Sequence, residues 1–323
     1  MPGEPSPTLV SLSKICELSC RRRIATKLVT SVLPVLAVSV SQITKVLQLS
    51  QQVSLVGVVN AFGDDQLNVD VLAENINRTA LAACPLGKHR QQRRGIPPSV
   101  LPRLRPRLAP SIISSNWSVG SIIGIWDGPS ALGQQPAEKM VTSVLGVYGP
   151  RTTIIMAVRV PGSEAIYLEA GLGPDADSDE PKMLMVRPQV RLADPPFKMR
   201  YLAPANLRAA AEDDKYMALI AHYVQQKYTL RYSGGLVPDV VRALVKKHGI
   251  YVSQVTEKSK AKLRRLYELC PIALSVECVG GRAVDPADGK DILAVSLEHC
   301  DERAGLVCGT TDKVEFVIRL LLD

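Results

Sequence analysis

The stretch that decides the fold runs from His222 to Gly281. It reads HYVQQKYTLRYSGGLVPDV at 222–240, KAKLRRLYELCP at 260–271 and ECVGG at 277–281. A cation-bearing strand ends in a paired-glycine turn, and a second basic segment ends in the carboxylate of Glu268. Because Arg and Lys bind phosphate oxygens and carboxylates bind hard cations, such a chain can hold a phosphorylated sugar at one end and a metal ion at the other.

Length and composition indicate a folded protein of two packed halves. The chain has 323 residues, of which 46% are apolar and only 4% aromatic, so aliphatic side chains must fill its core. Its seven cysteines, at positions 16, 20, 84, 270, 278, 300 and 308, form no CxxC pair. They indicate buried thiols in a reducing compartment and exclude a disulfide framework.

The net charge of +8 comes from one local run. Residues 87–110 hold seven Lys and Arg and no acid, and the rest of the chain is therefore near +1. Nucleic-acid binding through 88–107 is one hypothesis for this run. The run is rich in proline and lacks interleaved aromatic residues, so we expect no nucleic-acid partner.

The apolar segment 27–49 raises the question of a membrane span. Only about 17 residues separate its lysines, and Ser, Thr, Gln and Pro34 interrupt it, so we expect a packed pair of helices over 8–50 with a kink at Pro34 and no membrane partner. No signal peptide is evident.

Further along, strands alternate with helices, which favours an α/β fold in layers. We expect strands at 117–126 and 152–160, a hairpin or loop at 171–182, and helices at 64–83, 136–147 and 211–227. Residues 236–247 read as helix or loop, 260–268 as a helix start, and 271–281 as a strand or helix that enters a Gly-Gly turn.

Three motifs carry a family resemblance: Tyr148-Gly-Pro-Arg-Thr-Thr153, Pro204-Ala-Asn206-Leu-Arg-Ala, and Arg231-Tyr232 with the glycines that follow it. From about Asn60 onward the chain resembles the class 1 sugar bisphosphatases, and more the sedoheptulose-1,7-bisphosphatase branch than the fructose-1,6-bisphosphatase branch. The resemblance implies a layered αβαβα sandwich in two halves, 1–195 and 196–323, with the active site at their junction.

The resemblance also implies a metal-dependent phosphatase site. Glu268 falls where the family has a metal-ligand glutamate, and Asp64 and Asp70 fall beside the metals, where they would assist water activation; Mg²⁺ is the expected ion. Other interpretations of these residues are a solvated helix glutamate at Glu268 and a helix N-cap at Asp64.

The distal phosphate and the sugar would be held by Asn206, Arg231, Tyr232 and Lys262. Arginine supplies a bidentate fork, lysine a point charge, and Tyr and Asn directed hydrogen bonds. In the family this arginine reaches the site of a neighbouring subunit, which implies a homo-oligomer, either dimer or tetramer. Each cation could instead be an ordinary surface charge.

Two family motifs are missing where the basic run 87–110 stands: a Ser-Glu-Glu and an Asp-Pro-Leu-Asp-Gly-Ser-Ser, which supply metal-binding carboxylates and a phosphate cradle. Back-translation of His89-Arg-Gln-Gln-Arg-Arg94 with one base dropped can give Ile-Ala-Ser-Ser-Glu-Glu, and Arg103-Leu-Arg-Pro106 treated likewise can give Asp-Cys-Asp. We therefore predict that 87–110 is translated out of frame.

The function expected from the resemblance is Mg²⁺-dependent hydrolysis of the 1-phosphate of sedoheptulose 1,7-bisphosphate or fructose 1,6-bisphosphate. The alternative is a catalytically impaired relative, or a mistranslated gene, that keeps the fold but lacks most metal ligands; on this ground we expect the chain as written to be inactive or nearly so. An inositol-monophosphatase-like enzyme is a further alternative, against which Arg231, Tyr232 and Lys262 argue, since they suit a second phosphate.

Localisation follows from two further comparisons with the family. The positions that match a redox-active cysteine pair of the chloroplast enzymes are Val53 and Val58, so no disulfide switch can form there. The 62 residues before Gly63 match the usual length of this part of the family and leave no room for a transit peptide. We therefore expect a cytoplasmic location rather than a chloroplast one.

Overall fold

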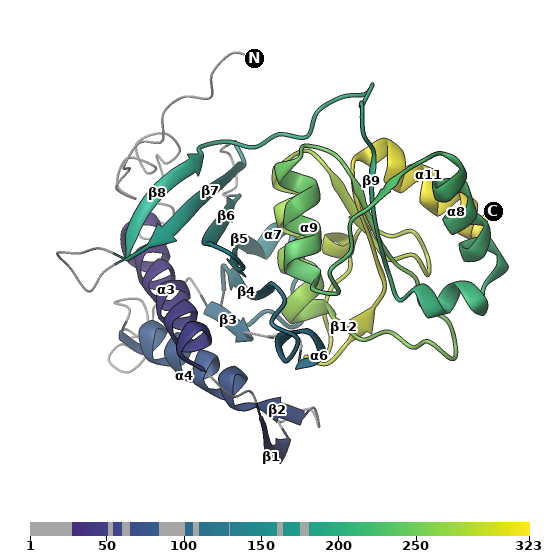
Figure 1. The fold of residues 1–323 in the computed structure, drawn as a ribbon. Helices are drawn as coiled ribbons and strands as arrows, with labels where there is room; N and C mark the ends of the chain where they lie inside the picture. The colour runs from purple at the N-terminus through teal and green to yellow at the C-terminus, as the bar shows by residue number, and fades with distance from the viewer. Residues whose placement is uncertain are drawn as a thin grey trace.

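The structure is a computed structural model. It describes residues 28–50, 54–59, 65–83, 101–105, 110–128, 130–159, 164–174 and 181–323. Two sheets alternate with three layers of helices, in the order helices, six-stranded sheet, helices, five-stranded sheet, helices (Figure 1). This arrangement confirms the expected αβαβα layering.

The first layer contains α3 (Leu33–Leu49) and α4 (Asn68–Ala83), which pack on the outer face of the six-stranded sheet (Figure 1). The π-helical turn η1 (Leu28–Val32) leads into α3, whose first turn contains Pro34, where a missing N–H costs least. The part of the expected helix at 8–27 lies outside the described residues. The helix expected from residue 64 begins at Asn68, because the preceding residues form β2 (Asp65–Leu67), which pairs with β1 (Leu55–Val59).

The six-stranded sheet is an antiparallel meander. Its strands, in spatial and chain order, are β3 (Leu101–Arg105), β4 (Val119–Trp126), β5 (Met140–Tyr148), β6 (Thr152–Val158), β7 (Ile166–Gly173) and β8 (Lys182–Arg187). The basic run thus contributes an edge strand, where Pro102 is tolerated. Two short helices, α6 (Pro110–Ile113) and α7 (Pro136–Lys139), flank β4.

The helix predicted over 136–147 is wrong. Only 136–139 is helical, and the remainder is β5 at the centre of the sheet. Eight of the nine residues of β5 are buried, because layers cover both faces of the sheet. A strand buried on both faces shows an unbroken apolar run instead of alternation, and such a run is easily confused with a buried helix.

The middle layer contains α9 (Leu236–Val245) and α10 (Cys270–Cys278), between the two sheets. The π-helical turn η3 (Arg265–Leu269) runs directly into α10. Helix α9 lies very close to β4: a Cβ atom built on Gly120 would fall 2.5 Å from Cβ of Val237. Only glycine allows this approach, and the approach brings the start of α9 to the start of β4.

The five-stranded sheet has the order β10 (Thr229–Leu230), β9 (Tyr201–Ala205), β11 (Ile250–Ser253), β15 (Leu306–Gly309), β13 (Arg282–Val284). Strands β10, β9 and β11 are parallel, and the other pairs are antiparallel. Helices α8 (Asp214–Gln225) and α11 (Thr311–Leu322) cover its outer face (Figure 1). The remaining elements are short: η2 (Leu207–Ala211), η4 (Ile292–Ala294), and a two-residue pairing of β12 (Leu263–Arg264) with β14 (Arg303–Ala304).

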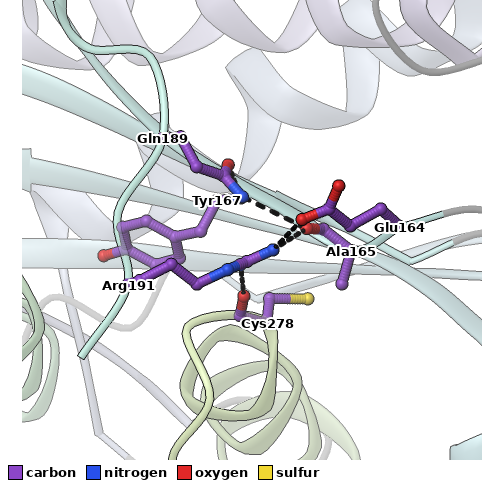
Figure 2. Close-up of polar contacts among 6 residues, drawn as sticks. All are labelled: Glu164, Ala165, Tyr167, Gln189, Arg191 and Cys278. Atoms are coloured by element: carbon purple, nitrogen blue, oxygen red, sulfur yellow. Dashed lines mark hydrogen bonds and ion pairs between the residues drawn. The ribbon is translucent and has the colours of Figure 1, made fainter. Parts of the chain in front are cut away.

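Arg191 joins the six-stranded sheet to the middle layer. Its guanidinium donates to the carbonyl oxygen of Cys278 at the end of α10, to the carbonyl of Ala165 at 2.8 Å, and to the carboxylate of Glu164 at 2.7 Å (Figure 2). Gln189 donates to the same carbonyl of Ala165. A cation at a helix C-terminus is favourable, because it meets unpaired carbonyls and the negative end of the helix dipole.

The described cysteines are all free thiols. Cys270, Cys278 and Cys308 are buried and Cys300 is half-buried. Burial raises the pKa of Cys270 and of Cys278 to about 12, so both are inert thiols at neutral pH. None of the helices in the described ranges is long and apolar enough to cross a membrane.

Candidate functional site

A pocket of about 430 Å³ opens where β4, β9, β11 and the start of α9 meet. Its volume lies within the range usual for small-molecule sites. We call it the central pocket. Its described lining is Ile112, Val119, Gly120, Ile122, Ala205, Asn206, Arg208, Tyr232, Gly234, Gly235, Leu236, Val237, Pro238, Tyr251, Ser253, Val255, Lys260, Lys262, Leu263 and Glu268.

Four of the seven residues predicted for the site line this pocket: Asn206, Tyr232, Lys262 and Glu268. They come from a strand end, a turn, a loop and a π-helical turn that span more than sixty residues of sequence. Lys262 is exposed at the pocket, whereas Glu268 is buried, with 7% of its surface accessible. The pocket therefore combines a solvated cation with a sequestered carboxylate.

Glu268 lies in the π-helical turn η3, where one carboxylate oxygen accepts a hydrogen bond from the backbone N–H of Arg264 at 2.7 Å. This bond spans the start of the turn and fixes the side chain against the pocket wall. Single π-helical turns are rare and often occur at functional sites. The expected helix start over 260–268 is accordingly a short strand, β12, followed by this turn.

Tyr232 is held by a turn whose anchor is Asp239. The carboxylate of Asp239 accepts from the backbone N–H of Ser233 at 2.8 Å, from the Ser233 hydroxyl at 2.7 Å, and from the N–H of Gly234 at 3.2 Å. Gly234 has a φ of +87°, which favours glycine. Asp239 is 5% exposed, and burial raises its pKa despite these hydrogen bonds. Tyr232 is thereby directed from the turn to the pocket wall.

The turn also brings the start of α9 to the pocket, since Leu236 and Val237 contribute to its lining. A helix N-terminus presents unpaired backbone N–H groups and a partial positive charge, which favour a bound anion. Tyr251 in β11 also lines the pocket, and its pKa is raised well above the usual value by burial and by neighbouring phenol, thiol and carboxylate groups. It therefore stays a neutral phenol.

Asn206 adopts a left-handed backbone conformation, with a φ of 52° and a ψ of 42°, at the end of β9. Its side-chain amide donates to the carbonyl of Gln254 at 2.6 Å and to the carbonyl of Ser259 at 3.4 Å. The amide hydrogens thus fasten the loop that leads to Lys262. The side-chain oxygen remains as an acceptor, which suits a sugar hydroxyl better than a phosphate.

Two of the other three predicted residues, Asp70 and Arg231, are not in the described lining of the central pocket. Asp64 lies outside the described residues. Asp70 lies in the first turn of α4, 9% exposed, where it accepts from the N–H of Leu67 at 3.4 Å. Arg231 is exposed and donates to the carbonyl of its neighbour Leu230 at 2.9 Å.

The described residues do not complete a metal site. Glu268 is the one carboxylate in the described lining of the central pocket, and these parts of the chain contain no cluster of three or more His, Cys, Asp or Glu that could hold an ion. A divalent cation such as Mg²⁺ usually needs several oxygen ligands. Most of the basic run, where the family carries further carboxylates, lies outside the described ranges.

Sequence reasoning missed three residues at this site. Asp239 stands within the stretch 222–240, four residues after the Gly-Gly pair, and a carboxylate that near in sequence can accept from the N–H groups of the turn. Arg208 and Lys260 also line the pocket. Their spacing was a usable signal, because each lies two residues from a predicted contact, Asn206 and Lys262 respectively.

A second, lateral pocket of about 750 Å³ adjoins the first and shares Val119 and Tyr232 with it. The end of α3 and the turn between β5 and β6 form much of it, and its described lining carries hydroxyl and amide groups but no charged side chain. The central pocket is therefore the better phosphate site of the two.

Comparisons with known proteins find relatives of this chain in sequence and in fold. The family "Fructose-1-6-bisphosphatase, C-terminal domain" matches residues 196–321. Chloroplastic sedoheptulose-1,7-bisphosphatase of Spinacia oleracea is 33% identical over 272 residues, which cover 79% of this chain and 65% of the spinach protein. The chain thus spans less than two thirds of that relative. Class 1 fructose-1,6-bisphosphatase of Syntrophotalea carbinolica is 28% identical, over 83% of this chain and 81% of its own length.

Among solved structures, a protein from Toxoplasma gondii that is provisionally assigned as a sedoheptulose-1,7-bisphosphatase superposes on this chain with a TM-score of 0.80 at 30% sequence identity. The alignment covers 97% of this chain and 99% of that one. A fructose-1,6-bisphosphatase of Leishmania major shares the fold, with a TM-score of 0.76 at 23% identity.

Proposed function

Because this chain belongs to the class 1 sugar-bisphosphatase family, we propose that it binds a sugar bisphosphate in the central pocket and that, with residues 87–110 in the corrected frame, it releases the 1-phosphate. The candidate substrates are sedoheptulose 1,7-bisphosphate and fructose 1,6-bisphosphate, after the relatives that bear these names. The observation that carries the proposal is that one pocket unites Lys262, Tyr232 and Asn206 with the buried carboxylate of Glu268.

In this proposal each pocket residue binds a different part of the substrate. Lys262 and the start of α9 attract the distal phosphate, and Tyr232 and the Asn206 side-chain oxygen orient the sugar by hydrogen bonds. Binding the far end of the substrate in this way positions the reacting phosphate, which lowers the barrier of the later step. Glu268 would face that reacting end from its buried position.

Mg²⁺ is the ion that we propose, because carboxylate oxygens are the ligands that it prefers. When bound, a divalent cation neutralises phosphate charge and activates water. Glu268 is the one carboxylate that the described residues bring to the pocket, so further ligands would have to come from elsewhere in the chain.

A catalytically impaired relative is the second candidate function, and the basic run favours it. Seven cations and no acid stand where the family carries metal-binding carboxylates. Such a protein would keep the pocket for the sugar phosphate and lose turnover. The prediction that 87–110 is translated out of frame separates the active enzyme from the impaired relative, because a frame-corrected chain can be compared with the chain as written.

Release of inorganic phosphate from both sugars, at saturating Mg²⁺, tests the proposal. The matched proteins are the chain as written, a frame-corrected chain, and the frame-corrected chain with Glu268→Gln. We expect turnover only in the second, at a rate on the order of 1–1000 per second. A frame-corrected chain that releases no phosphate contradicts the proposed activity, and ordinary turnover by the chain as written excludes the impaired candidate.

We also propose that the protein is a homo-oligomer, a dimer or a tetramer. Arg231 is exposed and lies apart from its own central pocket, beside Leu230, which is 60% exposed. These two side chains suit a contact with a neighbouring subunit. Light scattering of the purified protein measures the assembly directly, and a monomer at micromolar concentration would contradict it.

A further inference from the structure

Three cations belong to the described lining of the central pocket: Arg208, Lys260 and Lys262. We call them the cation rim. All three are exposed, and in the described parts of the chain no carboxylate lies within ion-pair distance of any of them. Lys258, on the same loop, differs from them, because its charge acts on the carboxylate of Glu212. The rim therefore carries unneutralised positive charge.

The loop that carries Lys260 and Lys262 is fastened to the segment that carries Arg208. The carboxylate of Glu212 accepts from the Thr256 hydroxyl, and from the N–H and hydroxyl of Ser259 at 3.2 and 3.1 Å. On the other side, Asn206 donates to two carbonyls of the same loop, as described above.

These bonds flank the rim in sequence. Arg208 lies between Asn206 and Glu212, and Lys260 follows Ser259 directly. The backbone positions of Arg208 and Lys260 are therefore held relative to each other, even though their side chains are exposed. Fixed backbones reduce the ordering cost that a ligand must meet when it binds.

The charge distribution of the pocket indicates what the rim binds. Glu268 is the one acid in the described lining and is buried, whereas the rim holds three exposed positive charges with no described partner. Like charges held near one another repel, and a dianion placed among them removes that repulsion. A phosphate group has this charge, and its oxygens suit both the arginine fork and the lysine point charges.

We propose that Arg208 and Lys260 join Lys262 in binding the distal phosphate, and that they set the preference of this pocket for sugars with two phosphates over sugars with one. This inference rests on the proposed function and deepens it. Arg208 and Lys260 are specificity-determining residues in it, because they contact the end of the substrate that does not react.

Calorimetric titration of the metal-free protein tests the inference without any need for turnover. The ligands are fructose 1,6-bisphosphate and fructose 1-phosphate at one fixed ionic strength, since exposed charges are screened by salt. We expect the double variant Arg208→Gln with Lys260→Gln to bind the bisphosphate about tenfold more weakly or worse, because each lost charge-assisted bond costs a large factor. Its affinity for fructose 1-phosphate should be unchanged.

Two control proteins sharpen the test. Lys258→Gln removes a charge from the same loop and should bind both ligands as the unsubstituted chain does. The charge-conserving pair Arg208→Lys with Lys260→Arg should keep the bisphosphate affinity within about threefold, since the dianion still meets two cations. Thermal melts of all variants should coincide, because the substituted side chains are exposed.

The outcomes separate this inference from the proposed function. One outcome overturns the inference alone. In it, the unsubstituted chain binds the bisphosphate and Lys262→Gln weakens that binding, but the double variant binds as tightly as the unsubstituted chain. If the double variant loses the same factor for both ligands, the residues act as a general surface charge and the inference is again overturned. If the unsubstituted chain binds neither ligand, the inference and the proposed function fall together.

Discussion

The side-chain amide nitrogen of Asn206 lies 2.6 Å from the carbonyl oxygen of Gln254 and donates a hydrogen bond to it. The sequence predicts that Asn206 contacts the distal phosphate and the sugar, but its N–H donor is bonded to the protein's own backbone. Its other carbonyl partner belongs to Ser259, at 3.4 Å. The left-handed conformation of Asn206 makes this reach possible, and asparagine tolerates that conformation better than most residues. Asn206 therefore positions the loop of Lys260 and Lys262, while its oxygen stays available to the sugar.

Replacement of Asn206 by aspartate should destabilise the protein and weaken ligand binding together. The carboxylate would lose both donors and face two carbonyl oxygens, at an expected cost of about 1–3 kcal/mol of unfolding free energy. Urea unfolding and bisphosphate titration measure the two effects. Asn116→Asp is the matched control, because Asn116 is also left-handed, with a φ of 57°, but is exposed. Equal stability of the two variants would contradict the assigned role.

Asp239→Asn should loosen the turn that presents Tyr232. An amide can still accept from Ser233, but its NH₂ group would then oppose the N–H of Gly234. We expect a loss of about 1–2 kcal/mol of unfolding free energy and weaker bisphosphate binding. Tyr232→Phe should weaken binding without changing stability, because the side chain is 43% exposed. Unchanged bisphosphate affinity in Asp239→Asn would show that the turn does not serve the pocket.

Gly120→Ala should force α9 away from β4. The added methyl group would fall 2.5 Å from Cβ of Val237 and 2.8 Å from the backbone oxygen of Gly146, neither of which can move freely. Overpacking of this kind costs about 1–3 kcal/mol, measurable by urea unfolding. Gly173→Ala, at the end of β7, is the control, since an added Cβ there meets nothing within 4 Å. A smaller loss for Gly120→Ala than for the control would contradict this packing.

His248 should make stability depend on pH. Its ring is stacked between Phe197 and Tyr201, at centroid distances of 4.3 and 5.0 Å, with Lys313 over the Phe197 ring and Arg242 over the Tyr201 ring. Burial, followed by Lys313 and Lys246, lowers the pKa of His248 from 6.5. Folding thus favours the neutral ring.

The sign of the pH effect follows from linkage. The contribution of His248 to the free energy of unfolding is complete above about pH 6.5, the unfolded-state pKa. It is lost as the pH falls through the lower folded-state pKa. Melting temperatures at pH 7.5 and 5.5 should therefore differ more for the unsubstituted protein than for His248→Phe, which keeps a stacked ring without the charge. His299→Gln, at an exposed position, serves as the control. An identical pH profile in His248→Phe would refute the assignment.

Much of the fold and part of the site could be predicted from local sequence. β4 and β6 have the small and β-branched residues that were read as strands, and α8 begins at the acidic N-cap Asp213. Strand β5 could not be separated from a helix, because burial on both faces removes the alternation that marks a strand. The convergence of Lys262, Tyr232 and Glu268 came from motif resemblance, since spacing along the chain does not encode a pocket.

The remaining features depend on contacts distant in sequence. The sequence near Asn206 does not indicate that its amide donates to a carbonyl 48 residues away, and the sequence near Arg208 does not indicate that it lines the same pocket as Lys260. Such pairs are fixed by the parallel alignment of β9 with β11, in which Ala205 lies opposite Ser253. Register of this kind emerges only when the sheet is assembled.

The most direct test of the account is a crystal structure of the protein with fructose 1,6-bisphosphate. We predict one sugar in the central pocket, with its distal phosphate within about 3 Å of the Lys262 ammonium and its other end toward Glu268. A sugar bound in the lateral pocket, or one whose phosphates contact neither Lys262 nor the start of α9, would contradict the account.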